Sequence, residues 1–120
     1  MRAYKLSAKA AKTGFDWPDA PAARQKVDEE LLELQEAAEA GDGDHTEEEL
    51  GDALFALAVY ARKLELEPET ALNRACNKFD RRFRYVEALV KADHREWKDL
   101  SLEDLTALWN QAKQHFSVTK

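Results

Sequence analysis

The sequence predicts an all-α fold, a bundle of four to five helices, and three observations support that prediction. Only 4 of the 120 residues are Gly and 3 are Pro, fewer than the frequent turns of a β-sandwich or barrel require. Apolar residues recur every three or four positions, and no segment shows the alternation typical of a half-buried strand. Hydrophobic residues make up 44% of the chain, enough for one core, so we expect a single domain over residues 1–120.

The apolar periodicity places five helices along the chain. They are expected over residues 3–12, 21–40, 47–64 and 68–91, and from Ser101 onward. Gly14 ends the first helix, and the aromatic loop Phe15-Asp16-Trp17-Pro18 leads to the second. The turn 41–44, composed of Gly and Asp, separates the second helix from the third. Pro68 suits the first turn of the fourth helix, and Ser101 is a favoured residue type for capping the fifth.

Each of the four longer helices carries an apolar stripe that we expect to face the core. The stripes are Val27, Leu31, Leu34 and Ala38 in the second helix; Leu50, Leu54 and Leu57 in the third; Leu72, Cys76, Phe79, Phe83, Val86 and Val90 in the fourth; and Leu105, Leu108, Ala112 and Phe116 in the fifth. Residues 53–61 of the third helix are apolar on every side. One small domain rarely covers such a helix alone, so we expect the helices to mediate a homodimer or a larger homo-oligomer.

Charge and cysteine content narrow the function classes. The net charge of −6 and the pI of about 5.1 argue against a general affinity for nucleic acid or for an anionic membrane. A single cysteine, Cys76, excludes an intramolecular disulfide framework and fits a reducing compartment. No apolar stretch follows Met1, and the longest apolar run, residues 53–61, is far shorter than the roughly 20 residues that cross a bilayer. We therefore expect a cytoplasmic protein.

The acidic residues are concentrated in one segment. Twelve of the 24 Asp and Glu residues lie between Asp28 and Asp52, and no Lys or Arg lies among them, so the rest of the chain has 18 basic and 12 acidic side chains. Like charges four residues apart on a helix repel by a few tenths of a kcal/mol per pair. Either the segment is a solvated acidic surface, or a bound cation offsets the repulsion.

Two carboxylate pairs within this segment favour a cation. Glu30 and Glu33 are three residues apart, as are Glu49 and Asp52, so each pair shares one helix face beside an apolar stripe. If the two helices pack antiparallel by these stripes, the pairs converge, and an all-oxygen set suits Mg²⁺ or Mn²⁺. Two other interpretations concern the start of the third helix. Thr46 and Glu49 can form a capping box, or Asp44 can cap the helix and leave Glu49 free.

Basic and aromatic residues recur at helical spacing in the last two helices. Lys78 and Arg82 are four residues apart in the fourth helix, and Trp109 and Lys113 are four apart in the fifth. Cations and an aromatic plane beside an acidic metal site are what a polyphosphate nucleotide requires. The alternatives are a core position for Trp109 and a solvated basic helix face for the arginines.

Several motifs resemble one family of enzymes. The segments Glu29-Glu30-Leu31-Leu32-Glu33 and Glu48-Glu49-Leu50-Gly51-Asp52 resemble the EExxE…ExxD signature of the all-α nucleoside triphosphate pyrophosphohydrolases. Residues 14–18, 77–84 and 108–113 resemble, in the same order, the catalytic C-terminal half of MazG proteins. The match covers nearly the whole chain and identifies it as a MazG-like domain.

The resemblance implies an activity and a cofactor. It implies a homodimer that hydrolyses nucleoside triphosphates (NTPs or dNTPs) to a nucleoside monophosphate and pyrophosphate, with Mg²⁺ as cofactor and Mn²⁺ as a substitute. Such an enzyme would clear unwanted nucleotides from the pool. The rival hypothesis is a non-catalytic dimeric helical interaction module, in which the acidic residues form a solvated face.

The resemblance also implies a role for individual residues. The metal ligands carried over are Glu30, Glu33, Glu49 and Asp52, with Glu29 and Glu48 as catalytic residues that orient water. The positions for phosphate and nucleotide binding are Lys78, Arg82, Trp109 and Lys113, with Phe15 and Trp17 lining the base pocket. Two features depart from the family: His45 stands where relatives often carry Lys, and MazG proteins often have two such domains.

Overall fold

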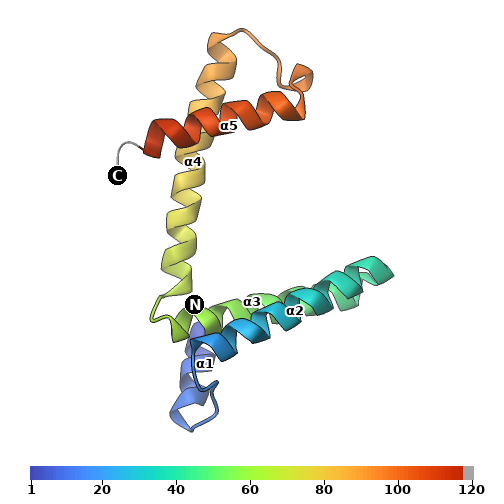
Figure 1. The fold of residues 1–120 in the computed structure, drawn as a ribbon, viewed down its shortest axis with the longest axis vertical. Coiled ribbons are helices and arrows are strands. Elements are labelled where there is room, and N and C mark those ends of the chain that lie inside the picture. Colours follow the sequence, from blue (N-terminus) through green and yellow to red (C-terminus); the bar gives the residue numbers. More distant parts are fainter. Residues whose placement is uncertain (118–120) are drawn as a thin grey trace. The chain divides into compact units, whose positions relative to one another are not determined.

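The computed structural model describes residues 1–117, and over that range it contains helices and no strand (Figure 1). The elements are α1 (Arg2–Lys12), α2 (Ala20–Ala40), α3 (Gly43–Lys63), α4 (Pro68–Ala92), the short 3-10 helix η1 (Trp97–Asp99) and α5 (Leu102–Ser117). The prediction of an all-α fold with five α-helices is confirmed. None of the helices in this range is both long enough and apolar enough to cross a membrane.

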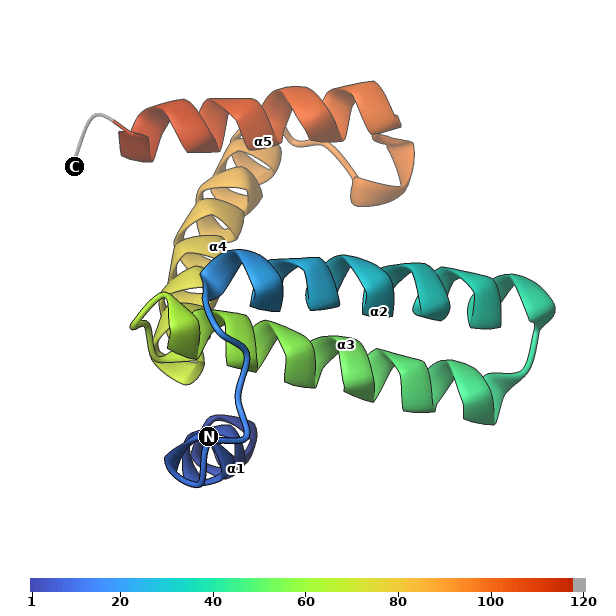
Figure 2. The ribbon, with the colours of Figure 1, turned by 60° about the horizontal axis from the view of Figure 1, so that its bottom comes forward.

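The chain forms two compact units, Met1–Ala71 and Leu72–Lys120. In the first unit, α2 and α3 run antiparallel side by side, and α1 packs on α3 (Figure 2). In the second unit, the C-terminal half of α4 packs against α5 around a small core of Val86, Val90, Leu108 and Ala112. The single domain expected over residues 1–120 remains a prediction.

Asp42 starts α3 earlier than the sequence predicts. Its carboxylate accepts a hydrogen bond from the backbone N–H of His45 at 3.1 Å, so the helix begins at Gly43. Thr46 donates its hydroxyl to the backbone carbonyl of Asp42 at 2.6 Å. The capping box of Thr46 with Glu49 and the cap at Asp44 were therefore both wrong, and the Glu49 carboxylate is not engaged at the helix start. The predicted cap at Ser101 is confirmed, since its hydroxyl accepts from the N–H of Asp104 at 3.0 Å.

Small side chains, not leucines, fill the buried face between α2 and α3. The buried apolar residues of these two helices are Ala23, Val27, Ala37, Ala53, Ala56, Ala58 and Val59. The predicted stripes were wrong in most positions: Leu31, Leu50, Leu54 and Leu57 are 45–56% exposed. Because α3 is apolar nearly all round, its periodicity does not indicate which flank faces inward, and the flank with the small side chains packs against its neighbours.

The predicted stripe of α4 is correct only at its C-terminal end. Val86 and Val90 are buried, whereas Leu72, Cys76 and Phe79 are exposed. The partners of the buried residues come from α5, and no residue of 68–79, the N-terminal half of α4, is buried in the described part of the chain. Each unit thus leaves apolar side chains exposed: the leucines of α2 and α3 in the first, and Leu72 and Phe79 of α4 in the second.

Candidate metal centre

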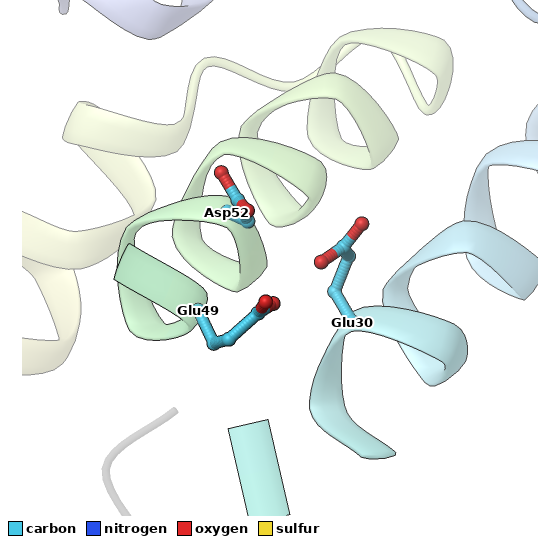
Figure 3. A group of neighbouring side chains, drawn as sticks. All are labelled: Glu30, Glu49 and Asp52. Carbon is cyan, nitrogen blue, oxygen red and sulfur yellow. The ribbon is translucent and has the colours of Figure 1, made fainter. Parts of the chain in front are cut away.

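Three carboxylates converge between α2 and α3. Glu30 extends from α2 toward Glu49 and Asp52, which lie one turn apart on α3 (Figure 3). One oxygen from each of the three lies within 4.8 Å of the other two. The antiparallel pairing that the spacing predicts is thus present, and it brings together three of the four expected ligands.

Two of these carboxylates have a buried oxygen without a hydrogen-bond partner among residues 1–117. Glu30 is 7% exposed, and its Oε2 accepts no hydrogen bond from residues 1–117; the same holds for Oε2 of Glu49. An unpaired carboxylate oxygen away from water is costly unless a cation compensates it. The donors are all carboxylate oxygens, which hard divalent cations prefer. The three side chains therefore fit a divalent cation such as Mg²⁺.

The negative charges of the cluster also affect the carboxyl group of Glu33. The negative charge of Glu30 raises the pKa of the Glu33 carboxyl above its ordinary value, and burial and the charge of Glu49 act in the same direction. Glu33 lines, with Glu49 and His45, a second hollow. The fourth predicted ligand therefore lies beside the three convergent carboxylates, although it is not one of them.

The remaining acidic candidates and His45 are exposed to solvent. Glu29 is exposed, with its Oε2 3.8 Å from the Nζ of Lys26, and Glu48 is exposed on α3. His45 is also exposed, and its Nε2 lies 3.8 Å from Oε1 of Glu49. The structure thus places an imidazole, one turn before Glu49, beside a predicted ligand.

A cleft of about 250 Å³ opens onto the carboxylates. Its walls are Trp17 from the loop, Ala23 and Lys26 of α2, and Phe55, Ala56 and Val59 of α3, and it ends at Glu30 and Asp52. An apolar cleft with a few convergent polar groups at one end is the usual form of a small-molecule site. Phe15 is 76% exposed and lines, with Trp17, a separate hollow of the loop, so its place in a base pocket stays a prediction.

Sequence reasoning did not assign the other five lining residues to the site, and Lys26 and Phe55 are the two largest of them. Nζ of Lys26 lies 3.0 Å from Oε1 of Glu30. The hydrogen bond that Lys26 donates to Glu30 raises the pKa of Lys26. Lys26 precedes Glu30 by four residues, and this spacing on one helix face could have indicated the contact. Phe55 lies in the all-apolar part of α3, where periodicity did not separate a pocket wall from an outer face.

The second unit groups the predicted basic and aromatic residues. The guanidinium of Arg82 lies 6.0 Å from the ring centre of Trp109, and its Nε is buried without a partner among residues 1–117. Phe79 packs against Trp109, with the two ring centres 5.3 Å apart. Lys78 and Lys113 are exposed on the same two helices and form no ion pair within the described part of the chain. These side chains can receive an anionic group beside an aromatic plane.

Comparison with known proteins decides the family. A family model described as the MazG nucleotide pyrophosphohydrolase domain matches residues 21–87, more than half of the chain. The chain belongs to the MazG family. The match begins in α2 and ends in α4, so it includes both acidic motifs as well as Lys78 and Arg82, and the resemblance predicted from the motifs is confirmed.

Curated relatives agree with this assignment. The chain is 39% identical over 111 residues to the nucleoside triphosphate pyrophosphohydrolase/pyrophosphatase MazG of Thermotoga maritima, a match that covers 92% of this chain and 42% of that protein. It is 40% identical over 116 residues to a nucleoside triphosphate pyrophosphohydrolase of Escherichia coli (strain K12), covering 95% of this chain and 44% of that enzyme. YabN of Bacillus subtilis, an uncharacterised protein, is 50% identical over 66 residues, which are 55% of this chain and 14% of YabN. The chain thus spans less than half the length of the MazG relatives that it matches.

Proposed function

We propose that this chain hydrolyses nucleoside triphosphates to a nucleoside monophosphate and pyrophosphate. The observation that carries the proposal is the convergence of Glu30, Glu49 and Asp52, with buried unpaired oxygens, in a chain of the MazG family. The printed names of the two MazG relatives describe this activity for those proteins. Clearance of unwanted nucleotides from the cytoplasmic pool is the role we propose for it.

The proposed cofactor is Mg²⁺, with Mn²⁺ as a substitute. Glu30, Glu49 and Asp52 would hold it, with Glu33 as a fourth ligand from the adjacent turn of α2. When bound, a divalent cation lowers the pKa of a water molecule and offsets charge on phosphate oxygens. Glu29 and Glu48, on the same two helices, are proposed to orient the attacking water and to accept its proton.

In the reaction, the oxygen of one water molecule forms a bond to the α-phosphorus. The bond between the α-phosphorus and the oxygen that bridges it to the β-phosphorus breaks, and the bridging oxygen leaves with pyrophosphate. Lys78, Arg82 and Lys113 are proposed to neutralise the leaving pyrophosphate, and Trp109 to stack on the nucleotide. These residues belong to the second compact unit.

The proposed assembly is a homodimer or a larger homo-oligomer. Leu31, Leu54 and Leu57 are 45–56% exposed on α2 and α3, and an apolar surface of this kind on a soluble chain indicates an interaction site. A second copy of the chain supplies a matching apolar surface through two-fold symmetry.

A pyrophosphate-release assay over a panel of natural and oxidised NTPs and dNTPs, with Mg²⁺ or Mn²⁺, tests the proposal. We expect metal-dependent release from wild type and a loss of at least 100-fold in Glu49→Gln, with unchanged helix content. Glu47→Gln, an exposed acid on the same helix, is the matched control and should remain active. Turnover by Glu49→Gln at the wild-type rate contradicts the proposed site.

Titration with Mn²⁺ and ATP, followed by electron paramagnetic resonance, separates the enzyme from the rival interaction module. We expect ATP to tighten Mn²⁺ binding by wild type, because both contact the same site. A non-catalytic module with a solvated acidic face gives no such coupling, and that result would reject the enzymatic function.

A further inference from the structure

A cluster of charged side chains ties the loop between α1 and α2 to the C-terminal end of α3. Oδ1 of Asp16 accepts a hydrogen bond from Nη2 of Arg62, and Oδ2 of Asp16 accepts one from Nζ of Lys63 at 2.9 Å. Arg62 also donates from Nε to the hydroxyl of Ser7 on α1 at 2.9 Å. One guanidinium therefore connects α1, the loop and α3, although 46 residues separate it from Asp16.

The members of this cluster are largely removed from water. Ser7 is buried, and the exposed fractions of the side chains are 13% for Arg62 and 17% for Asp16 and Lys63. Partly buried, hydrogen-bonded ion pairs hold their geometry better than exposed pairs do. The hydrogen bond from Arg62, with that from Lys63, lowers the pKa of Asp16 to about 2.

The backbone on either side of Asp16 leaves the loop few alternatives. Before it, Gly14 has a φ of +99°, and the N–H groups of Gly14 and Phe15 bond to the carbonyls of Ala11 and Ala10, which completes a Schellman motif at the end of α1. After it, Pro18 restricts Trp17 to an extended backbone. Between these two constrained flanks, the Asp16 contacts anchor the loop to α3 one residue before Trp17.

Trp17 forms one wall of the cleft that ends at Glu30 and Asp52. The opposite walls, on α2 and α3, belong to rigid helices, whereas Trp17 lies on a loop of few residues between helices. If the triphosphate meets the carboxylates, the apolar part of this cleft is left for the nucleoside. The indole is then the wall whose position depends on a contact far away in the sequence.

We propose that Asp16 and Arg62 are positioning residues that hold the Trp17 indole against the nucleoside part of the substrate. The inference rests on the proposed function and deepens it: the ion pair contributes to nucleoside recognition and leaves the phosphate and metal contacts unchanged. Neither residue touches the reacting atoms, so both act through Trp17.

Asp16→Asn tests the proposal by a comparison of ligands with and without a nucleoside. We expect KM for a nucleoside triphosphate to rise about tenfold with kcat within twofold of wild type. The affinity for inorganic tripolyphosphate, measured as competitive inhibition, should stay unchanged, because that ligand lacks a nucleoside. Asp28→Asn, which breaks an exposed ion pair with Arg24 in the same unit, is the matched control and should leave both constants unchanged.

A double-mutant cycle distinguishes positioning from a general structural role. We expect Asp16→Asn to have no further effect on KM in a Trp17→Ala background, because the residue on which it acts is gone. Arg62→Lys should retain part of the wild-type KM, whereas Arg62→Met should match Asp16→Asn. Additive effects of Asp16→Asn and Trp17→Ala, or an equal loss of tripolyphosphate affinity, would overturn the proposal.

A fluorescence measurement tests the positioning without any turnover. In a Trp97→Phe/Trp109→Phe background, Trp17 is the only indole of the chain. We expect Asp16→Asn to raise the acrylamide quenching constant of Trp17 by about twofold, and an unchanged constant counts against the inference. A wild type that releases no pyrophosphate from any nucleotide would reject the proposed function, and this measurement would still decide whether Asp16 fixes Trp17.

Discussion

The ammonium of Lys26 lies 3.0 Å from Oε1 of Glu30, the most buried carboxylate of the candidate metal centre. The protein therefore supplies one positive charge to a cluster of three carboxylates, and the pair is four residues apart on one helix. The other oxygen of Glu30, Oε2, remains without a hydrogen-bond partner in residues 1–117. One oxygen is thus satisfied by the chain itself and the other is available to a cation.

Lys26→Met should destabilise the protein most when no divalent cation is present. The substitution leaves Glu30 buried without its counter-charge, which we expect to cost about 1 kcal/mol because Lys26 is 39% exposed. Saturating Mg²⁺ should remove most of the difference, since it supplies the missing charge. Urea unfolding with EDTA and with Mg²⁺ checks this. A difference that is the same in both conditions contradicts it.

Glu49→Gln should abolish stabilisation by the metal. A ligand at about 100 times its Kd raises the free energy of unfolding by about 2.7 kcal/mol. We expect a gain of this size for wild type in Mg²⁺ and almost none for Glu49→Gln, while Glu47→Gln should behave as wild type. Thermal unfolding followed by circular dichroism measures the gain. A full Mg²⁺-induced rise in Tm of the Glu49 variant would show that the cation binds elsewhere.

Asp16→Asn should cost stability at neutral pH but not in acid. The folded-state pKa of Asp16, about 2, lies below its ordinary value of 3.8, so its charge stabilises the fold above about pH 4 and that contribution is lost as the pH falls through 2. Allowing for solvent screening, we expect a deficit of about 1 kcal/mol at pH 6 that narrows toward pH 2. Unfolding curves at several pH values measure it, with Asp28→Asn as control. A deficit independent of pH indicates a cause other than the charge.

Glu65→Gly and His94→Gly should each stabilise the protein. Glu65 (φ +62°) and His94 (φ +54°) occupy the left-handed position that follows α3 and α4, the position that Gly14 occupies after α1. A side chain there costs about 1 kcal/mol relative to glycine, so each substitution should raise the free energy of unfolding by about that amount. Glu47→Gly, within α3, should lower it by a similar amount. A loss of stability in both end variants would contradict the prediction.

Leu54→Glu/Leu57→Glu should convert an oligomer into a monomer. Both leucines are about half exposed on the outer flank of α3, and a charge there opposes apolar contact with a second copy. Sedimentation velocity at several concentrations gives the masses of wild type and variant. Leu102→Glu, at the start of α5 and 79% exposed, is the control. A monomeric wild type would reject the proposed homo-oligomer.

Contacts within a helix and between the two consecutive helices α2 and α3 were predictable from the sequence, and the contact between the loop and the end of α3 was not. The spacing of Glu30, Glu49 and Asp52 predicted their convergence, because one helical turn separates Glu49 from Asp52 and one antiparallel pairing joins them to Glu30. The ion pair of Asp16 with Arg62 spans 46 residues, and nothing in either local segment indicates the other. The start of α3 was misjudged because Thr46, Asp44 and Asp42 are all acceptable caps, and only backbone geometry selects Asp42.

The buried side of α3 shows where apolar periodicity fails. Leucine outranks alanine in hydrophobicity, so the sequence favoured a stripe of Leu50, Leu54 and Leu57 facing inward. The structure buries Ala53 and Ala56 instead and leaves those leucines exposed. In a helix that is apolar on every side, hydrophobicity does not choose between an intramolecular and an intermolecular contact.

The alanines between α2 and α3 have a consequence for ion size. Ala53 follows Asp52 directly, and its small, buried side chain belongs to the layer that sets how close the carboxylate-bearing helices come. Mg²⁺ needs oxygens at about 2.0–2.1 Å, and Ca²⁺ at about 2.3–2.6 Å. A bulkier side chain at this position would hold the two helices further apart, and the separation of the ligand oxygens is what distinguishes a site for the smaller ion from a site for the larger one.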